Sequence, residues 1–265
     1  MVRSKEDLTC SVIESYKCGP MKVLVDKGDY LDIMFLNTGT RMSVNRYACK
    51  GGSIKDPNHP SIYGVAFMGM GPYKPTLDGN TTSAYRVWLG ILGRCYGENN
   101  ESRVFYGSKG TYVNPLWLNF QTFAHWYYLN HKEGFEIDKD ILAPLSKCYG
   151  PDTCCMVPKK INLAVKTAAS EDNWATYTKK SGELVYSPTC TVGGKTVALG
   201  RFTNKEEATL AYKNTKESMV RDLATEYYEN GLLEDYIYDA LMKWECILGN
   251  EITRRKDNIR CTRNR

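Results

Sequence analysis

One lysine in the middle of the chain, Lys139, lies between two carboxylates, Asp138 and Asp140. A lysine ammonium ordinarily has a pKa of about 10.4 and is protonated at neutral pH. It can accept a proton only if burial or nearby positive charge lowers that pKa by roughly three units, and flanking carboxylates act in the opposite direction. A protonated lysine can instead stabilise a pentavalent phosphate or a leaving oxygen. Alternatively, Lys139 only neutralises the two carboxylates or contacts a phosphate backbone.

The segments before this run predict an α+β protein that begins with a small antiparallel sheet. Three short runs, 21–26, 30–37 and 41–47, are separated by glycine-containing turns, and apolar residues alternate within the second run. The first twenty residues lack a clear period and predict a loosely packed lead-in. The glycine-rich stretch 63–73 has no Lys-Ser/Thr after it, so close backbone packing and turns explain it better than a phosphate-binding loop.

Two aromatic helices are expected next. The first covers 83–96, with Thr82 or Ser83 as its N-cap, and is weakened by Gly90 and Gly93. The second runs from an Asn114 N-cap, with proline in its first turn, to about residue 130. Their tryptophans fall within helical apolar patterns, which favours core packing over base stacking.

After a polar linker, three further strands are expected at 174–178, 184–191 and 195–202. Pro188 falls within the central one and removes a ladder donor, so that strand is bulged or its register differs. A capping-box sequence at Thr203 to Glu206 starts a helix that ends at Gly231. A last helix is expected from Glu234 to Leu248.

Charge, apolar stretches and cysteine spacing indicate which partners and which cellular compartment to expect for this chain. The net charge of +5 is concentrated at the end, where residues 250–265 hold six basic and two acidic side chains. This tail is either a solvated, frayed terminus or an arm that neutralises phosphates, and the second reading is favoured beside a nucleic-acid-binding domain. No apolar stretch is long enough to span a membrane and the start lacks the apolar core of a signal peptide, so we expect a cytoplasmic protein with no membrane partner. The ten cysteines include no C-x-x-C pair, which indicates reduced thiols and no structural zinc.

Many of these residues together resemble one family. The matching positions are Lys55-Asp56-Pro57, Tyr63-Gly64-Val65, Tyr85, Trp88, Arg94-Cys95-Tyr96, Trp117 to Phe120, Phe123 to Trp126, Asp138 to Leu142, Cys148-Tyr149, Cys154, Val157-Pro158, Ile161-Asn162, Leu199 to Phe202 and Glu206 to Ala208. With them the chain resembles bacteriophage HNH-type (ββα-metal) endonuclease-like proteins that carry a C-terminal APETALA-like DNA-binding domain.

The resemblance implies a metal site in which some of the family's usual residues are replaced by others. Asp138 takes the place of the first ligand and Asn162 that of the last, for magnesium or manganese if the site is active. Lys139 occupies the position of the general base, which HNH chemistry normally assigns to histidine. Ser146 or Lys147 falls where the turn asparagine is expected. The family itself commonly has Asp-Lys-Asp, whereas the turn change is particular to this chain.

The resemblance also implies that a three-stranded sheet lies in the DNA major groove. The expected contacts are polar and basic side chains on its exposed face and in the tail: Lys179, Lys180, Ser187, Thr189, Thr191, Lys195, Arg201, Arg254 and Arg255. The alternative is that these side chains only solvate one face of the sheet.

The expected organisation is a β-rich module at 1–79, an HNH-like ββα domain with aromatic helices at 80–166, an APETALA-like domain at 167–250 and a basic tail at 251–265. The leading hypothesis is a phage-encoded double-stranded DNA-binding protein of HNH endonuclease descent, with a degenerate metal site and weak or no cleavage. The first alternative is an active divalent-metal-dependent nicking endonuclease of homing type. The second is an interaction protein that binds a host factor through its N-terminal module.

Overall fold

The computed structural model describes residues 6–97, 110–144, 146–168, 174–192, 195–249 and 251. The chain has the expected α+β class, with helices and mainly antiparallel strands. Its contacts divide it into two compact units, Met1–Leu129 and Asn130–Arg265. This division does not coincide with any of the boundaries expected at 79, 166 and 250, which remain predictions.

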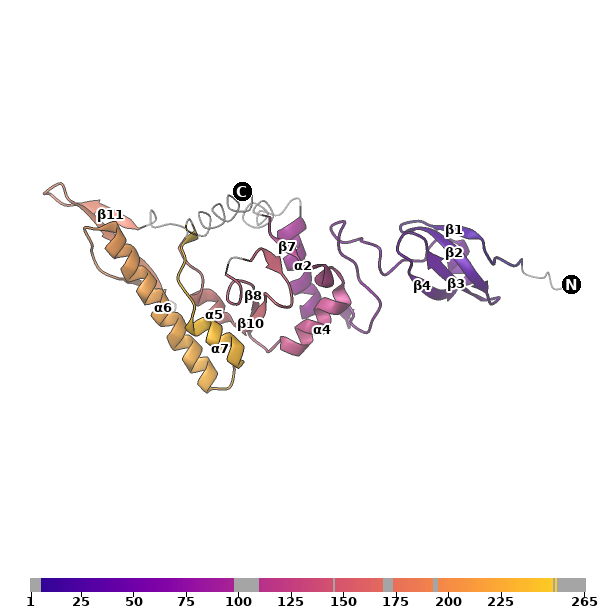
Figure 1. The fold of residues 1–265 in the computed structure, drawn as a ribbon. Helices are drawn as coiled ribbons and strands as arrows, with labels where there is room; N and C mark the ends of the chain where they lie inside the picture. Colours follow the sequence, from indigo (N-terminus) through magenta and orange to yellow (C-terminus); the bar gives the residue numbers. More distant parts are fainter. Residues whose placement is uncertain are drawn as a thin grey trace, which may run out of the picture. The chain divides into compact units, whose positions relative to one another are not determined.

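Unit 1 begins with a four-stranded antiparallel sheet in sequential order (Figure 1). Its strands are β1 (Val12–Ser15), β2 (Gly19–Asp26), β3 (Tyr30–Phe35) and β4 (Arg41–Asn45). Alternate residues of β3 are fully buried, as the sequence predicted: Leu31, Ile33 and Phe35. The prediction of a loosely packed lead-in was wrong, because β1 pairs with β2 along its whole length.

The short helix α1 (Arg46–Lys50) follows β4 where the sequence predicted continued strand. The Asn45 side chain accepts hydrogen bonds from the backbone N–H groups of Tyr47 and Ala48, which caps the helix. The segment 6–56, which we call the N-terminal module, holds the whole of one apolar cluster built on the sheet.

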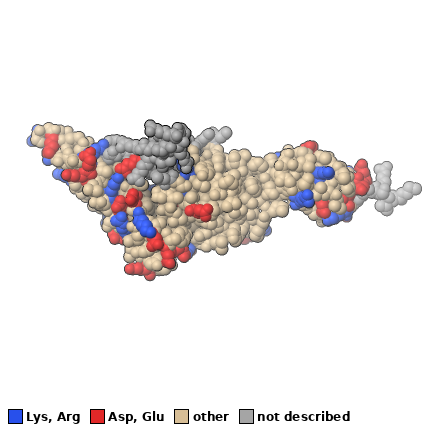
Figure 2. Space-filling model, in the orientation of Figure 1, with Lys and Arg blue, Asp and Glu red and all other residues tan. Residues whose placement is uncertain are grey.

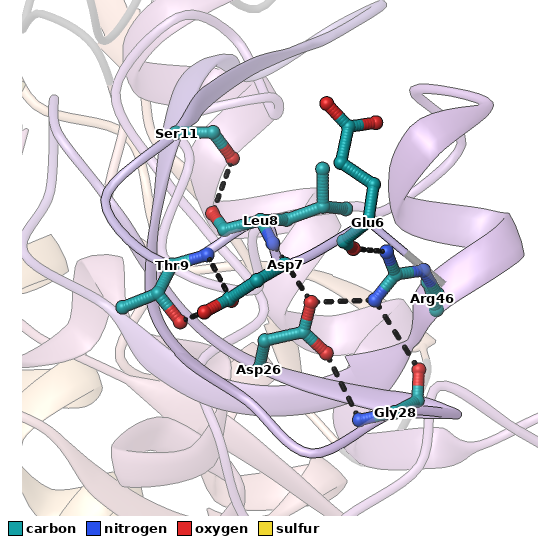
Figure 3. A network of polar contacts seen from close by, with 8 residues as sticks. All are labelled: Glu6, Asp7, Leu8, Thr9, Ser11, Asp26, Gly28 and Arg46. Atoms are coloured by element: carbon teal, nitrogen blue, oxygen red, sulfur yellow. Dashed lines mark hydrogen bonds and ion pairs between the residues drawn. The ribbon is translucent and has the colours of Figure 1, made fainter. Parts of the chain in front are cut away.

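A buried ion pair joins α1 to the edge of this module (Figure 3). Arg46 Nη1 lies 2.5 Å from Asp26 Oδ2, and the two side chains are only 5% and 8% exposed. Asp26 also accepts hydrogen bonds from the backbone N–H groups of Leu8 and Gly28. The two backbone hydrogen bonds, together with the one from Arg46, lower the pKa of Asp26 to about 2. The other guanidinium nitrogen of Arg46 donates to the carbonyl oxygen of Glu6, so the ion pair fixes the first described residues of the chain.

The rest of unit 1 is dominated by two aromatic helices. A small hairpin, β5 (Thr76–Leu77) and β6 (Asn80–Thr81), leads into α2 (Ser83–Tyr96), whose N-cap is Thr82. Next come β7 (Tyr112–Val113), the 3₁₀ helix η2 (Pro115–Leu118) and α4 (Phe120–Asn130). The single helix predicted from Asn114 is therefore interrupted. The break lies at Asn119, which has extended backbone angles, while Asn114 caps η2 as expected.

The expected core role of the tryptophans is confirmed in this region. Trp88 of α2 donates a 2.6 Å hydrogen bond from Nε1 to the carbonyl oxygen of Trp117. The Trp117 ring centre lies 4.7 Å from that of Trp126. The glycine-rich stretch packs against the same region, because a Cβ atom on Gly69 would lie 2.1 Å from Asn119 Oδ1. Close backbone packing, as predicted, explains that glycine.

Unit 2 begins with β8 (Phe135–Asp138), β9 (Cys148–Tyr149), β10 (Cys155–Pro158) and α5 (Lys159–Ala164). It continues with β11 (Ala175–Thr178), β12 (Leu184–Ser187), β13 (Thr189–Val192), β14 (Lys195–Ala198), α6 (Lys205–Glu229) and α7 (Asp235–Met242). The helix α6 is capped by Asn204, one residue after the predicted cap, and α7 ends six residues before the predicted end. Figure 1 shows α5 and α7 beside α6, in agreement with their contacts.

The second unit has one continuous apolar core. Residues of the ββα segment, such as Val157 and Ile161, belong to the same cluster as Tyr212 and Val220 of α6 and Leu241 of α7. The ββα segment and the C-terminal strands are thus packed through shared apolar residues. No helix in the described part of the chain is long and apolar enough to cross a membrane.

Candidate active site and nucleic-acid interface

The stretch that resembles an HNH motif folds as two antiparallel strands followed by a helix, β8, β10 and α5. Asp138 is the last residue of β8 and pairs with Cys155, at the start of β10. Asn162 lies in the middle of α5. The order strand, strand, helix is the one that the resemblance implied, so the next question is how the expected site residues are used.

Asp138 organises the turn that follows it. Its Oδ1 atom accepts hydrogen bonds from the backbone N–H groups of Asp140, at 2.7 Å, and Ile141, at 2.8 Å. Loss of water raises the pKa of this carboxyl, although the hydrogen bond from Ile141 acts in the opposite direction. One oxygen of the expected metal ligand is therefore engaged in local structure.

Lys139 is a buried lysine with three neighbours of its own. Its Nζ atom lies 2.5 Å from Asp140 Oδ1 and donates to the carbonyl oxygen of Ser146 at 3.3 Å. The same atom lies 5.9 Å from the centre of the Tyr149 ring. The Ser146 hydroxyl oxygen, at the position of the expected turn asparagine, accepts from the backbone N–H of Cys148. Through these contacts Lys139 connects the turn after β8 with the following loop. Its ammonium group lies beside Asp140, one of the two carboxylates that it was expected to neutralise.

Asn162 contacts a residue that the sequence analysis did not select, Glu136. Its Nδ2 atom donates a 2.6 Å hydrogen bond to Glu136 Oε2. Glu136 and Asp138 are two residues apart in β8, so their side chains lie on the same face of the strand. The acidic spacing Glu-Ile-Asp in a predicted strand was the available signal. The described contacts join Asn162 to Glu136 and do not join it to Asp138.

Two adjacent thiols lie beside this segment. Cys154 and Cys155 are both buried, and loss of water raises the pKa of Cys154 to about 12 and that of Cys155 still further. Both are therefore neutral at physiological pH. Within the residues that the structure describes, there is no group of three or more His, Cys, Asp or Glu side chains that could hold a metal ion.

The C-terminal strands form an antiparallel meander whose middle strand is divided at Pro188. β11 pairs with β12, and β13 pairs with β14. Beyond β14 the chain returns to β12, where Tyr186 and Phe202 exchange both backbone hydrogen bonds. The strand is interrupted at Pro188, where the sequence predicted a bulge or a different register, and the Pro188 carbonyl oxygen accepts from the backbone N–H of Leu199.

One face of this meander packs on α6 and the other is open. Tyr186, Cys190 and Phe202 belong to the apolar core of unit 2. Since side chains alternate along a strand, Thr189 and Thr191 lie on the open face, and both are exposed.

The open face carries an arginine above an aromatic ring. The guanidinium carbon of Arg201 lies 5.7 Å from the centre of the Tyr177 ring. Tyr177 is the direct cross-strand partner of Val185, so the two side chains share a face, on which Val185 is buried and Tyr177 is exposed. The contact holds the Arg201 guanidinium on a ring plane while the side chain remains exposed.

The remaining candidates lie around this pair. Lys179 and Lys180 are exposed in the turn after β11, where Lys179 Nζ is 2.7 Å from Glu183 Oε2. Lys195 is exposed at the start of β14, whereas Ser187 is half-buried and donates to the carbonyl oxygen of Gly200. Arg254, Arg255 and most of the basic tail lie outside the described residues.

Comparisons of the chain with protein-family models, with curated proteins and with solved structures found no match.

Proposed function

We propose that the chain is a phage-encoded double-stranded DNA-binding protein of HNH endonuclease descent, which binds duplex through the open face of its C-terminal strands and cleaves weakly or not at all. The observation that carries the proposal is the Arg201 guanidinium held over the Tyr177 ring on that face. An arginine fixed in this way loses little side-chain freedom when it binds.

The chemistry of the open face suits the major groove. Arginine makes paired hydrogen bonds to the O6 and N7 atoms of guanine, and a threonine can contact several base edges. Arg201, Thr189 and Thr191 provide these groups on one face, and Lys179 and Lys180 extend from the adjacent turn toward phosphates. Backbone-directed lysines would position the sheet while Arg201 reads a base.

The contacts of the HNH-like segment support weak or absent cleavage. A magnesium or manganese ion at this site would depend on Asp138 and Asn162. Asp138 Oδ1 is occupied by two backbone N–H groups, and Asn162 Nδ2 donates to Glu136, which fixes the orientation of the amide whose oxygen would be the ligand. Lys139 is buried against Asp140, so it is poorly placed to replace histidine as a base.

Duplex binding can be tested by fluorescence anisotropy with labelled DNA fragments at several salt concentrations. We expect Arg201→Ala to weaken binding by roughly 5- to 150-fold on a preferred site, the loss of one paired base contact. Lys179→Gln together with Lys180→Gln should weaken binding to all sequences and reduce the salt slope by about 2. Lys243→Gln, an exposed lysine just after α7, is the matched control. Equal affinity of the wild-type protein and the Arg201 variant would overturn the proposal.

One observation favours the second candidate, a metal-dependent nickase. Glu136 and Asp138 share a face of β8, and Asn162 reaches Glu136, so two carboxylates and an amide gather there. The test is incubation of supercoiled DNA with the protein and Mg²⁺ or Mn²⁺. Nicking that is lost in Glu136→Gln, Asp138→Ala and Asn162→Ala would establish this candidate in place of the non-cleaving one.

A further inference from the structure

A tyrosine in the N-terminal module presents its ring to solvent. Tyr16 follows β1 and is 83% exposed. A Cβ atom built on Gly52 would lie 3.5 Å from both Cε atoms of the Tyr16 ring, so the ring lies face-on over that glycine. The backbone N–H of Tyr16 donates to the carbonyl oxygen of Gly52 at 2.9 Å, which holds the two segments together. One ring face is thus supported by backbone and the other is open.

The support under the ring requires glycine. Gly52 has φ of +65°, and a Cβ atom there would lie 2.9 Å from the carbonyl oxygen of Glu14. Any larger residue would be strained and would disturb the segment on which the ring rests. The sequence therefore keeps a flat support beneath Tyr16.

Lysines occur on the segments that adjoin Tyr16. Ser15 Oγ donates to the carbonyl oxygen of Ile54, and the backbone N–H of Asp56 donates to Cys18 Sγ, so residues 15–18 lie alongside 52–56. Three exposed lysines lie on these segments: Lys17 follows Tyr16 directly, Lys50 precedes Gly52 by two residues, and Lys55 follows Ile54. Figure 2 shows Lys and Arg side chains together with Asp and Glu side chains on the visible face of this module. We call Tyr16 and these three lysines the Tyr16 patch.

Of the nearby carboxylates, only the exposed Glu14 offsets part of these three positive charges. Asp56 is buried and accepts hydrogen bonds from the hydroxyl of Thr38 and the backbone N–H of Asn58. Glu14 is the exposed acid closest in sequence to Tyr16. An open aromatic face with an excess of ammonium groups around it is complementary to a base next to phosphates.

We propose that the Tyr16 patch binds single-stranded nucleic acid, with one base stacked on Tyr16 and neighbouring phosphates paired with the lysines. Base stacking on an exposed aromatic ring, combined with a basic surface along the backbone, is the common chemistry of sequence-tolerant single-strand binding. A duplex does not offer a base face to the ring. The Tyr16 patch belongs to unit 1 and the Arg201 face to unit 2, so this binding role of the N-terminal module is independent of the duplex-binding proposal.

The test is fluorescence anisotropy of a labelled twelve-nucleotide oligothymidylate with the full chain. Tyr16→Ala should weaken binding by roughly 5- to 150-fold, whereas Tyr16→Phe keeps the ring and should bind like the wild type. Tyr30→Ala removes another exposed tyrosine of the same module and serves as the control. Lys17→Gln with Lys55→Gln should reduce the salt slope by about 1.4, and Lys22→Gln should leave it unchanged.

Each outcome decides the proposal. A loss confined to Tyr16→Ala and the lysine pair supports it, and an oligouridylate of the same length shows whether RNA is also bound. Absence of oligothymidylate binding, or equal binding by Tyr16→Ala and Tyr16→Phe, would overturn it. Duplex affinity of the Tyr16→Ala variant should equal that of the wild type, so a failed duplex-binding proposal can be recognised separately.

Discussion

The Nζ atom of Lys216, on α6, donates a 2.7 Å hydrogen bond to the carbonyl oxygen of Ala164, the last residue of α5. Carbonyl groups at the end of a helix lack partners within it and carry partial negative charge. Lys216 is buried, and loss of water lowers the pKa of its ammonium group. The hydrogen bond from the buried ammonium group of Lys216 therefore connects the ββα segment with α6.

The lowered pKa of Lys216 predicts a pH dependence of stability. Between its folded pKa and the ordinary value of 10.5, the unfolded chain binds more protons, so stability increases as pH rises through this range. Lys216→Met removes the effect. We expect the unfolding free energy of the wild type, minus that of the variant, to increase with pH up to about 10.5 in urea titrations. A difference that is constant or decreases would show that the ammonium is not disfavoured by burial.

Lys139→Met tests whether this lysine has a structural or a DNA-contacting role. Removal of one partner of an ion pair is costly when it leaves the other charge buried, but the Asp140 side chain is 55% exposed and stays solvated. We therefore expect the unfolding free energy to change by no more than about 1 kcal/mol and duplex affinity to stay the same. Chemical denaturation and anisotropy measure the two quantities. A clear loss of duplex affinity in a folded variant would assign Lys139 to the DNA backbone instead.

The contact between Arg201 and Tyr177 predicts coupled effects on duplex binding. Tyr177→Ala should weaken binding less than Arg201→Ala, and the double variant should resemble Arg201→Ala alone. A cation over an exposed ring contributes about 0.5–1 kcal/mol, which sets the expected coupling. A double-mutant cycle from anisotropy data measures it, with Tyr177→Phe as the variant that retains the ring. Strictly additive losses would mean that the ring does not position the guanidinium.

The lowered pKa of Asp26 predicts acid sensitivity of the N-terminal module. A carboxyl whose folded pKa is depressed stabilises the fold above its ordinary pKa, and this stabilisation is lost as pH falls to about 2. Hydrogen exchange of peptides from 8–56, corrected for intrinsic rates, should show protection falling between about pH 4 and pH 2. Asp26→Asn should be less protected at pH 6 and should lack this particular decrease. Identical profiles for the two proteins would contradict the role of the ion pair.

Two glycines should respond to alanine in opposite directions. Gly90, within α2, has open space around it, so Gly90→Ala should stabilise the protein by roughly 0.5–1 kcal/mol. Gly69 has φ of +70° and faces Asn119, so Gly69→Ala should destabilise it by more than about 1 kcal/mol. Denaturation curves of the two variants distinguish these results. Destabilisation by Gly90→Ala would mean that α2 is more tightly covered than the structure indicates.

Elements with a strong local signal could be predicted from the sequence. The limits of α2 follow from its Thr82 cap and apolar spacing, and three C-terminal strands with a break at Pro188 follow from alternation and proline chemistry. β1 was missed because most of its side chains are not buried and therefore leave no apolar period. The break at Asn119 depends on the approach of Gly69, which is far away in the sequence.

The site was predicted only in part, because some of its contacts join residues that are far apart in the sequence. The sequence located Asp138, Lys139 and Asn162 on a strand, strand, helix segment, and the structure has that order. It did not predict that Asn162 pairs with Glu136, because this contact depends on how α5 packs on β8. The burial of Lys139 likewise depends on the loop that closes over it at Ser146.

The continuous core of unit 2 restricts how its two parts can evolve. Val157 and Ile161 share one apolar cluster with Tyr212 and Leu241, so neither part buries its own residues without the other. Recombination that exchanged α6 and α7 alone would expose these side chains and favour aggregation. Substitutions in residues 135–164 are therefore limited by their packing on α6 and α7, whatever chemistry the Asp138 to Asn162 segment performs.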